Sequence, residues 1–168
     1  RQLPDWKRQR ESLMGQAKLF RAMNYFHLVK FFGDVPLILE PYESLEDMFV
    51  SRTASKEVYA QIIQDLQDAS AVLNDAAYTQ NGFRVTKWVA ETMLADVYLT
   101  LSGYPVQENH YADAAKAARN VINSHRHAMI ENQDTEANSA YNQIRTLDDS
   151  NEYIFSREYD ANTFLTYP

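Results

Sequence analysis

Three histidines and two carboxylates in one part of the chain have the side-chain chemistry of a metal site. His110, His125 and His127 are close in sequence to Glu108 and Asp113, and zinc accepts imidazole and carboxylate ligands. Histidines separated by one residue project from different sides of a helix, however, and the sequence has no pair of histidines four residues apart. We therefore interpret them as solvated loop residues and expect neither a metal nor a cofactor.

Adjacent carboxylates suggest a second kind of chemistry, glycoside hydrolysis. Glu46 is followed by Asp47, and Asp148 by Asp149, but hydrolysis needs an acid and a base held ~5–10 Å apart, and neighbouring acids in loops usually face solvent. The sequence also has no Gly-x-Ser-x-Gly elbow, phosphate-binding glycine loop or dinucleotide fingerprint. We predict that the chain is not an enzyme.

Aromatic side chains outside the helical patterns fit the third chemistry, sugar binding. A pyranose ring needs a flat apolar surface, and its hydroxyls need planar polar partners such as amides and guanidinium groups. The candidate ligand-binding residues are Trp6, Tyr42, Tyr78, Asn81, Phe83 and Arg84. Two alternatives stay open: each aromatic ring could instead pack against other parts of the protein, and Arg21 and Arg84 could be structural ion-pair partners of Asp96 or Glu91.

Composition and charge limit the classes of protein to consider. Gly occurs 4 times and Pro 5 times among 168 residues, which favours helix over a turn-rich β fold. The formal net charge of −7 argues against a nucleic-acid partner, since phosphate binding depends on concentrated Lys and Arg. Without cysteine the chain has no disulfide and no thiolate site.

Apolar residues recur at intervals of three and four and predict helices near residues 8–32, 55–74, 87–102 and 110–124, with a shorter one near 137–145 and an extended segment at 153–156. Gly33 and Pro36 end the first helix, and Ser55 and Thr86 are the expected N-caps of the next two. The predicted inward face of the first helix carries Leu13, Ala17, Phe20, Met23, Tyr25, Leu28, Phe31 and Phe32. That of the fourth carries Tyr111, Ala114, Ala115, Ala118, Val121 and Ile122.

Two stretches of the chain are alike. Ala22 precedes Tyr25 by three residues in the first helix, and Ala95 precedes Tyr98 by three in the third. Small residues facing aromatic ones let two antiparallel helices approach closely, as in tetratricopeptide repeats. We predict an all-α fold of tetratricopeptide-like antiparallel helix pairs that forms a single domain over residues 1–168. No apolar run is long enough to span a membrane. Because the chain opens without Met and ends on apolar residues, we expect it to be a fragment of a longer protein.

Residues 15–37 (GQAKLFRAMNYFHLVKFFGDVPL) resemble the opening helix and turn of the SusD/RagB family of outer-membrane nutrient-binding lipoproteins. Further stretches resemble later landmarks of that family, in the family's order. These are residues 52–59 (RTASKEVY), 62–66 (IIQDL), 84–87 (RVTK), 95–100 (ADVYLT) and 151–155 (NEYIF).

The resemblance implies a non-enzymatic, surface-exposed lipoprotein of the outer membrane, in which tetratricopeptide-like helices form a scaffold beside a SusC-like TonB-dependent transporter and loops hold an oligosaccharide. Members of the family are about three times as long as this chain, so the lipid anchor would lie outside it. The alternative function is a tetratricopeptide-type module whose concave face binds a peptide or protein.

Overall fold

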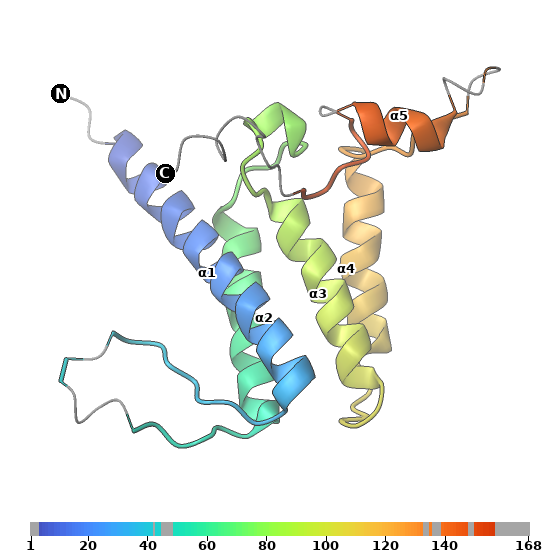
Figure 1. Ribbon diagram of the computed structural model, residues 1–168. Helices are drawn as coiled ribbons and strands as arrows, with labels where there is room; N and C mark the ends of the chain where they lie inside the picture. The colour runs from blue at the N-terminus through green and yellow to red at the C-terminus, as the bar shows by residue number, and fades with distance from the viewer. Residues whose placement is uncertain are drawn as a thin grey trace, which may run out of the picture.

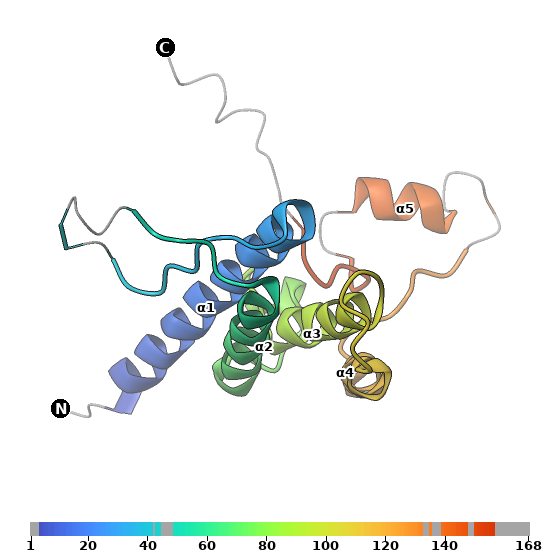
Figure 2. The same ribbon diagram turned by 90° about the horizontal axis from the view of Figure 1, so that it is seen from below.

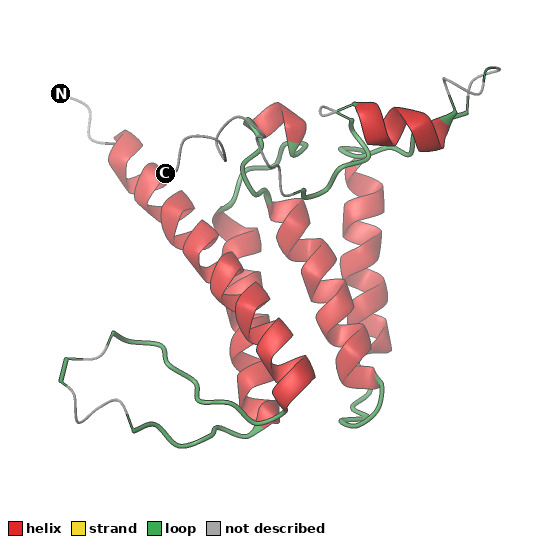
Figure 3. Ribbon diagram, in the orientation of Figure 1, coloured by secondary structure: helices red, strands yellow, loops and turns green. Residues whose placement is uncertain are grey.

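The computed structural model describes residues 4–41, 43–44, 49–132, 135, 139–147 and 150–156, without the side chains of residues 4 and 5. Its helices are α1 (Pro4–Phe32), α2 (Ser55–Val72), α3 (Lys87–Ser102), α4 (Tyr111–Ser124) and α5 (Ala140–Thr146), with a short 3₁₀ turn at Thr79–Asn81. The four long predicted helices are confirmed. In the described ranges the only β pairing is an isolated bridge between Val35 and Thr53. No strand is drawn in Figure 3, and residues 153–156 form none.

The four long helices stand in a row in chain order, each antiparallel to the next (Figure 1). Seen from below, α2 lies between α1 and α3, and α4 is at the far end of the row (Figure 2). The closest packing is within the pairs α1/α2 and α3/α4, which α2 and α3 then join. This arrangement confirms the predicted all-α fold of antiparallel pairs. No helix in the described part of the chain is both long and apolar enough to cross a membrane.

Local signals in the sequence explain where the helices begin and end. The left-handed backbone of Gly33 (φ +66°) ends α1, and its amide donates to the carbonyl of Val29 at 3.0 Å. The start of α2 differs from the prediction by one residue: Ser55 is the first helical residue, and its amide donates to Asp34 at 2.7 Å. Thr86 does occupy the N-cap of α3, although its side chain makes no capping hydrogen bond.

The core runs along the facing sides of α1, α2 and α3. On α1 the buried residues are Leu19, Ala22, Phe26 and Val29, at alternating steps of three and four. They pack on a stripe of α2 formed by Val58, Tyr59, Ile62, Leu66 and Ala69, whose other flank meets Val89, Ala90, Leu94, Val97 and Leu101 of α3.

The predicted inward face of α1 was largely wrong, and that of α4 was only partly right. In α1, Leu13, Phe20, Leu28, Phe31 and Phe32 are exposed. This helix is apolar on two opposite faces, and periodicity alone does not identify the one that meets α2. In α4, Tyr111, Ala115 and Ile122 are exposed, while Ala114 and Ala117 are buried. The reason is that, among the described helices, α4 packs on α3 alone, so a narrow alanine stripe is enough to cover the contact.

Candidate functional site

A polar pocket of about 600 Å³ lies between the first half of α1 and the segment that connects α2 to α3. The α1 side contributes Arg8, Gln9, Ser12, Leu13 and Gln16. The opposite side contributes Val72, Leu73, Asn74, Asp75, Asn81, Arg84 and Val85. Two of the residues predicted to bind ligand, Asn81 and Arg84, therefore share one wall.

Hydrogen bonds hold the α2–α3 segment in a defined shape. The amide group of Asn81 donates to the carbonyl of Arg84 at 3.2 Å and accepts from the Asn74 side chain at 2.9 Å. The carbonyl of Asn74 in turn accepts from the amide of Lys87 at 3.1 Å, which closes the segment onto the start of α3. Because Gly82 and Phe83 both have positive φ (+62° and +57°), the chain reverses sharply beside Arg84. The wall of the pocket is therefore preformed.

The pocket offers mainly hydrogen-bond donors and amide groups. The guanidinium groups of Arg8 and Arg84 are exposed, and among the described residues neither has an ion-pair or hydrogen-bond partner. Asp75 is held by Arg126 at 3.4 Å. Planar donors and amides of this kind suit the hydroxyls of a saccharide, and the lining includes no cysteine or histidine that could act as a nucleophile or general base.

The predicted aromatic residues differ in their access to this pocket. Tyr78 is 3% exposed, and its ring packs edge-on against Phe83 and Phe155 at centroid distances of 5.6 and 5.9 Å. Its hydroxyl donates to the carbonyl of Ser156 at 3.0 Å, so the structure gives Tyr78 a packing role. Phe83 is partly exposed.

Trp6 is exposed and lies seven residues, about two helical turns, before Leu13, which lines the pocket. The two side chains are therefore on the same face of α1. Tyr42, the remaining candidate, lies outside the described residues. The structure thus places Asn81 and Arg84 in the pocket, Trp6 on the α1 face that borders it, and Phe83 next to Arg84 in sequence.

The α1 half of the pocket contains none of the residues predicted to bind ligand. Gln9, Ser12 and Gln16 follow one another at steps of three and four, which places them on one side of the helix. The polar face formed by these three residues could have been recognised from the sequence. What the sequence could not show was that this side of α1 faces the α2–α3 segment.

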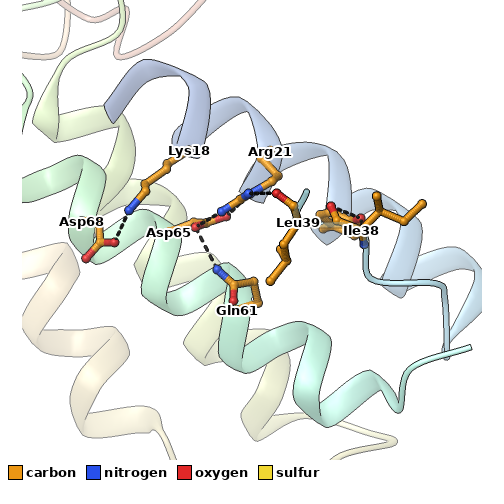
Figure 4. Close-up of polar contacts among 8 residues, drawn as sticks. Lys18, Arg21, Ile38, Leu39, Gln61, Asp65 and Asp68 are labelled. Atoms are coloured by element: carbon orange, nitrogen blue, oxygen red, sulfur yellow. Dashed lines mark hydrogen bonds and ion pairs between the residues drawn. The ribbon is translucent and has the colours of Figure 1, made fainter. Parts of the chain in front are cut away.

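An ion pair between the half-buried Arg21 and the buried Asp65 holds α1 on α2 (Figure 4). Nε and Nη2 of Arg21 each donate to a different carboxylate oxygen of Asp65 at 2.7 Å, and Gln61 donates to the same carboxylate at 3.0 Å. The hydrogen bond to Asp65 raises the pKa of Arg21 above its ordinary value. The suggested pairing of Arg21 with Asp96 or Glu91 was therefore wrong.

A second ion pair on the same two helices joins Lys18 to Asp68 at 2.5 Å (Figure 4). The hydrogen bond from Lys18 lowers the pKa of Asp68. Lys18 and Asp68 also line a cavity of about 400 Å³ on the other side of α1, where Lys7 approaches Glu11 at 3.9 Å. Because several of its charged groups already pair with one another, this cavity offers a ligand fewer free donors than the pocket beside Arg84.

The histidines do not form a metal site in the part of the chain that the structure describes, where no group of three or more His, Asp or Glu side chains could hold an ion. The prediction that His110 is a solvated loop residue was wrong, because its imidazole contacts two carboxylates. Its Nε2 lies 3.2 Å from Glu108 and its Nδ1 lies 3.3 Å from Asp113, while Lys56 of α2 pairs with Glu108 at 2.7 Å.

This cluster predicts a pH-dependent stability. Hydrogen bonds to Glu108 and then Asp113 raise the pKa of His110 above its usual 6.5, so its stabilising contribution is complete below pH 6.5 and is lost as the pH rises through the raised value. Hydrogen bonds from Lys56 and then His110 lower the pKa of Glu108 below its usual 4.5, so its contribution is lost only as the pH falls through that lowered value. The cluster should therefore stabilise the protein most between pH 4.5 and 6.5.

Melting temperatures at pH 5.5 and 8.5 test this prediction. His110→Gln should lower the melting temperature more at pH 5.5 than at pH 8.5, because only the protonated imidazole forms ion pairs with the carboxylates. His27→Gln, on the exposed side of α1, is the matched control and should show no such difference. An equal effect of His110→Gln at both pH values would contradict the assignment.

Taken together, the antiparallel helix pairs form a tetratricopeptide-like helical scaffold, and a polar pocket lies between α1 and the α2–α3 segment. The match to known proteins is more specific. Residues 2–99 match the SusD-like family described as "Starch-binding associating with outer membrane", and the chain belongs to this family.

Individual relatives share both sequence and helix arrangement. A SusD-like protein of Formosa agariphila is 36% identical over 114 residues, which are 67% of this chain and 21% of that protein. A SusD-like protein of Bacteroides fragilis has a crystal structure that matches with a TM-score of 0.75 at 27% identity, over 92% of this chain and 28% of its own. A laminarin-binding SusD-like protein matches with a TM-score of 0.55 at 32% identity, over 65% of this chain and 23% of its own. The matched regions thus make up between a fifth and a third of each relative.

Proposed function

We propose that the protein binds an oligosaccharide at the bacterial outer membrane and does not cleave it. The observation that carries the proposal is the pocket beside Arg84, which combines unpaired guanidinium groups and amides with an aromatic residue on the bordering face of α1. Membership of a family described as starch-binding supports a saccharide ligand, and the laminarin-binding relative supports a glucan.

The cellular location and the partner of the protein are part of the same proposal. The description of the family supports association with the outer membrane. We further propose that the protein is a surface-exposed lipoprotein, anchored through a residue outside these 168, that passes the oligosaccharide to a SusC-like TonB-dependent transporter. Residues 1–168 would form one helical domain of it. Co-purification of the complete protein with the product of a neighbouring TonB-dependent transporter gene tests the partnership, and failure of the two to associate in detergent would contradict it.

Calorimetry of the complete protein with starch-derived and laminarin-derived oligosaccharides tests the binding function. We expect a dissociation constant in the micromolar to millimolar range, because stacking and hydroxyl contacts in an open groove recover only part of the cost of ordering the ligand. Binding should persist in EDTA, and no reducing sugar should be released. Heat with peptides and none with any glycan would instead favour the peptide-binding alternative.

Substitution of Arg84 tests whether the ligand occupies this pocket. Arg84→Ala should weaken binding about tenfold, the equivalent of losing one charge-assisted hydrogen bond of ~1.5 kcal/mol. Arg119→Ala, which removes an equally charged and exposed side chain from α4, is the matched control and should leave the affinity unchanged. If glycan binds but both variants bind it equally well, the ligand site lies elsewhere in the protein.

A further inference from the structure

The polar pocket beside Arg84 has an excess of positive charge. Its lining contains two arginines, Arg8 on α1 and Arg84 on the α2–α3 segment, and one acid, Asp75. Asp75 already pairs at 3.4 Å with Arg126, which lies outside the lining. Both guanidinium groups of the pocket are therefore left without an acidic partner in the described part of the chain, although the whole sequence has a formal net charge of −7.

This excess is unusual for the cations that join α1 to α2. Lys18 pairs with Asp68 at 2.5 Å, and Arg21 pairs with Asp65 at 2.7 Å. In the pocket, by contrast, two like charges line one space and no described acid is free to offset their repulsion, so a bound anion would be favoured. Because both arginine side chains are exposed, the protein folds without neutralising them, and their charge is available to a ligand.

Most of the pocket's other donors already make hydrogen bonds within the protein. The side-chain amide of Asn81 donates to the carbonyl of Arg84 at 3.2 Å, and that of Asn74 donates to Asn81 at 2.9 Å. The amide of Gln16 donates to Ser12 at 3.4 Å. The two guanidinium groups, each with five N–H bonds and no acceptor, are therefore the main donors left for a ligand.

Cationic donors of this kind match a ligand group that accepts hydrogen bonds and carries negative charge. A guanidinium binds a carboxylate or a similar oxyanion through two parallel, charge-assisted hydrogen bonds. A neutral sugar hydroxyl both donates and accepts, and it gains no attraction between opposite charges. The pocket therefore favours an anionic group over a hydroxyl.

We infer that the oligosaccharide bound in this pocket is acidic and carries a uronate carboxylate or a sulfate ester that Arg8 and Arg84 bind. The inference rests on the proposed saccharide-binding function and narrows it to one chemical class of glycan. Because the two arginines come from opposite sides of the pocket, the acidic sugar would lie between α1 and the α2–α3 segment. A neutral glucan would bind the same pocket more weakly.

Calorimetry of the complete protein with two matched pairs of saccharides tests the inference. One pair is a galacturonate oligosaccharide and its methyl ester, and the other is a laminarin-derived oligosaccharide with and without sulfate groups. The charged member of at least one pair should bind about tenfold more tightly than its neutral partner, and the pair that shows this preference identifies the anion. The preference should decline between about 0.05 M and about 0.5 M NaCl, because salt screens exposed charges.

Charge variants of the complete protein show whether this pocket is responsible. Arg84→Gln keeps a planar amide but removes the charge, so it should weaken binding of the charged saccharide about tenfold and of the neutral one by a smaller factor. Arg84→Lys, which keeps the charge without the planar fork, should retain part of the preference. Arg119→Gln, at an exposed position on α4, is the matched control and should leave the preference unchanged.

The outcomes separate this inference from the proposed function. Equal affinities for the charged and neutral members of both pairs would overturn the inference and leave saccharide binding intact. A preference that Arg84→Gln does not reduce would place the anion elsewhere in the protein and would overturn it too. If no saccharide binds, charged or neutral, the proposed function fails and the inference fails with it.

Discussion

Replacing Arg21 by alanine should lower the free energy of unfolding by about 3–5 kcal/mol, because the carboxylate of Asp65 would stay buried with no cation to balance it. Asp65 is 1% exposed and receives both of its short hydrogen bonds from Arg21. The remaining donor, Gln61 at 3.0 Å, is uncharged. Chemical denaturation followed by circular dichroism measures the change, and the loss of helix should stay cooperative.

Two comparisons separate this explanation from a general sensitivity of α1. Lys18→Ala removes the neighbouring ion pair on the same helices, but both of its partners are about one-third exposed, so the loss should be within ~1 kcal/mol. The double variant Arg21→Met with Asp65→Leu should recover most of the stability, because it leaves no unpaired charge and fills a similar volume. A loss for Lys18→Ala as large as that for Arg21→Ala would rule out burial as the cause.

The helices were predictable because each is encoded locally. Periodic apolar residues and the stop at Gly33 depend only on neighbours within a few turns, and the structure places α1 and α3 as expected. The three-residue spacing of Ala22 and Tyr25 in the sequence, which Ala95 and Tyr98 repeat, likewise predicted antiparallel helix pairs. The pairing follows from the narrow, small-residue faces of the helices, which are visible in the sequence.

The choice of buried face in α1 was not predictable from periodicity. Leu19 and Phe20 are adjacent and equally apolar, yet Leu19 is fully buried and Phe20 is not. Which one meets α2 depends on the side of α1 that carries Arg21 and Lys18, whose partners Asp65 and Asp68 lie on α2. Those pairings form between residues more than forty positions apart, so only the tertiary register reveals them.

The residues of the candidate site also differ in whether local sequence could identify them. Asn81 and Arg84 could be proposed because a polar turn with aromatic neighbours is recognisable in sequence. Arg8 and Gln16 could not, since their role depends on α1 passing over the α2–α3 segment. The burial of Tyr78 also depends on Phe155, which is distant in sequence.

The second large effect concerns Leu66, which lies at the centre of the stripe of α2. It is fully buried, within the cluster that includes residues of both α1 and α3. Leu66→Ala should lower the free energy of unfolding by about 2–5 kcal/mol, because the surrounding helices cannot collapse fully into the cavity that is left.

Leu99→Ala on α3 is the matched control, since it removes the same atoms from a side chain that is 56% exposed. Its loss should be below ~1 kcal/mol, because few apolar contacts disappear and no cavity forms. The difference between the two leucines follows from geometry: Leu66 lies where α1, α2 and α3 meet, whereas Leu99 points away from that junction. Denaturation of the two variants under the same conditions measures it, and similar losses would mean that the helices are not packed around α2 as the structure has them.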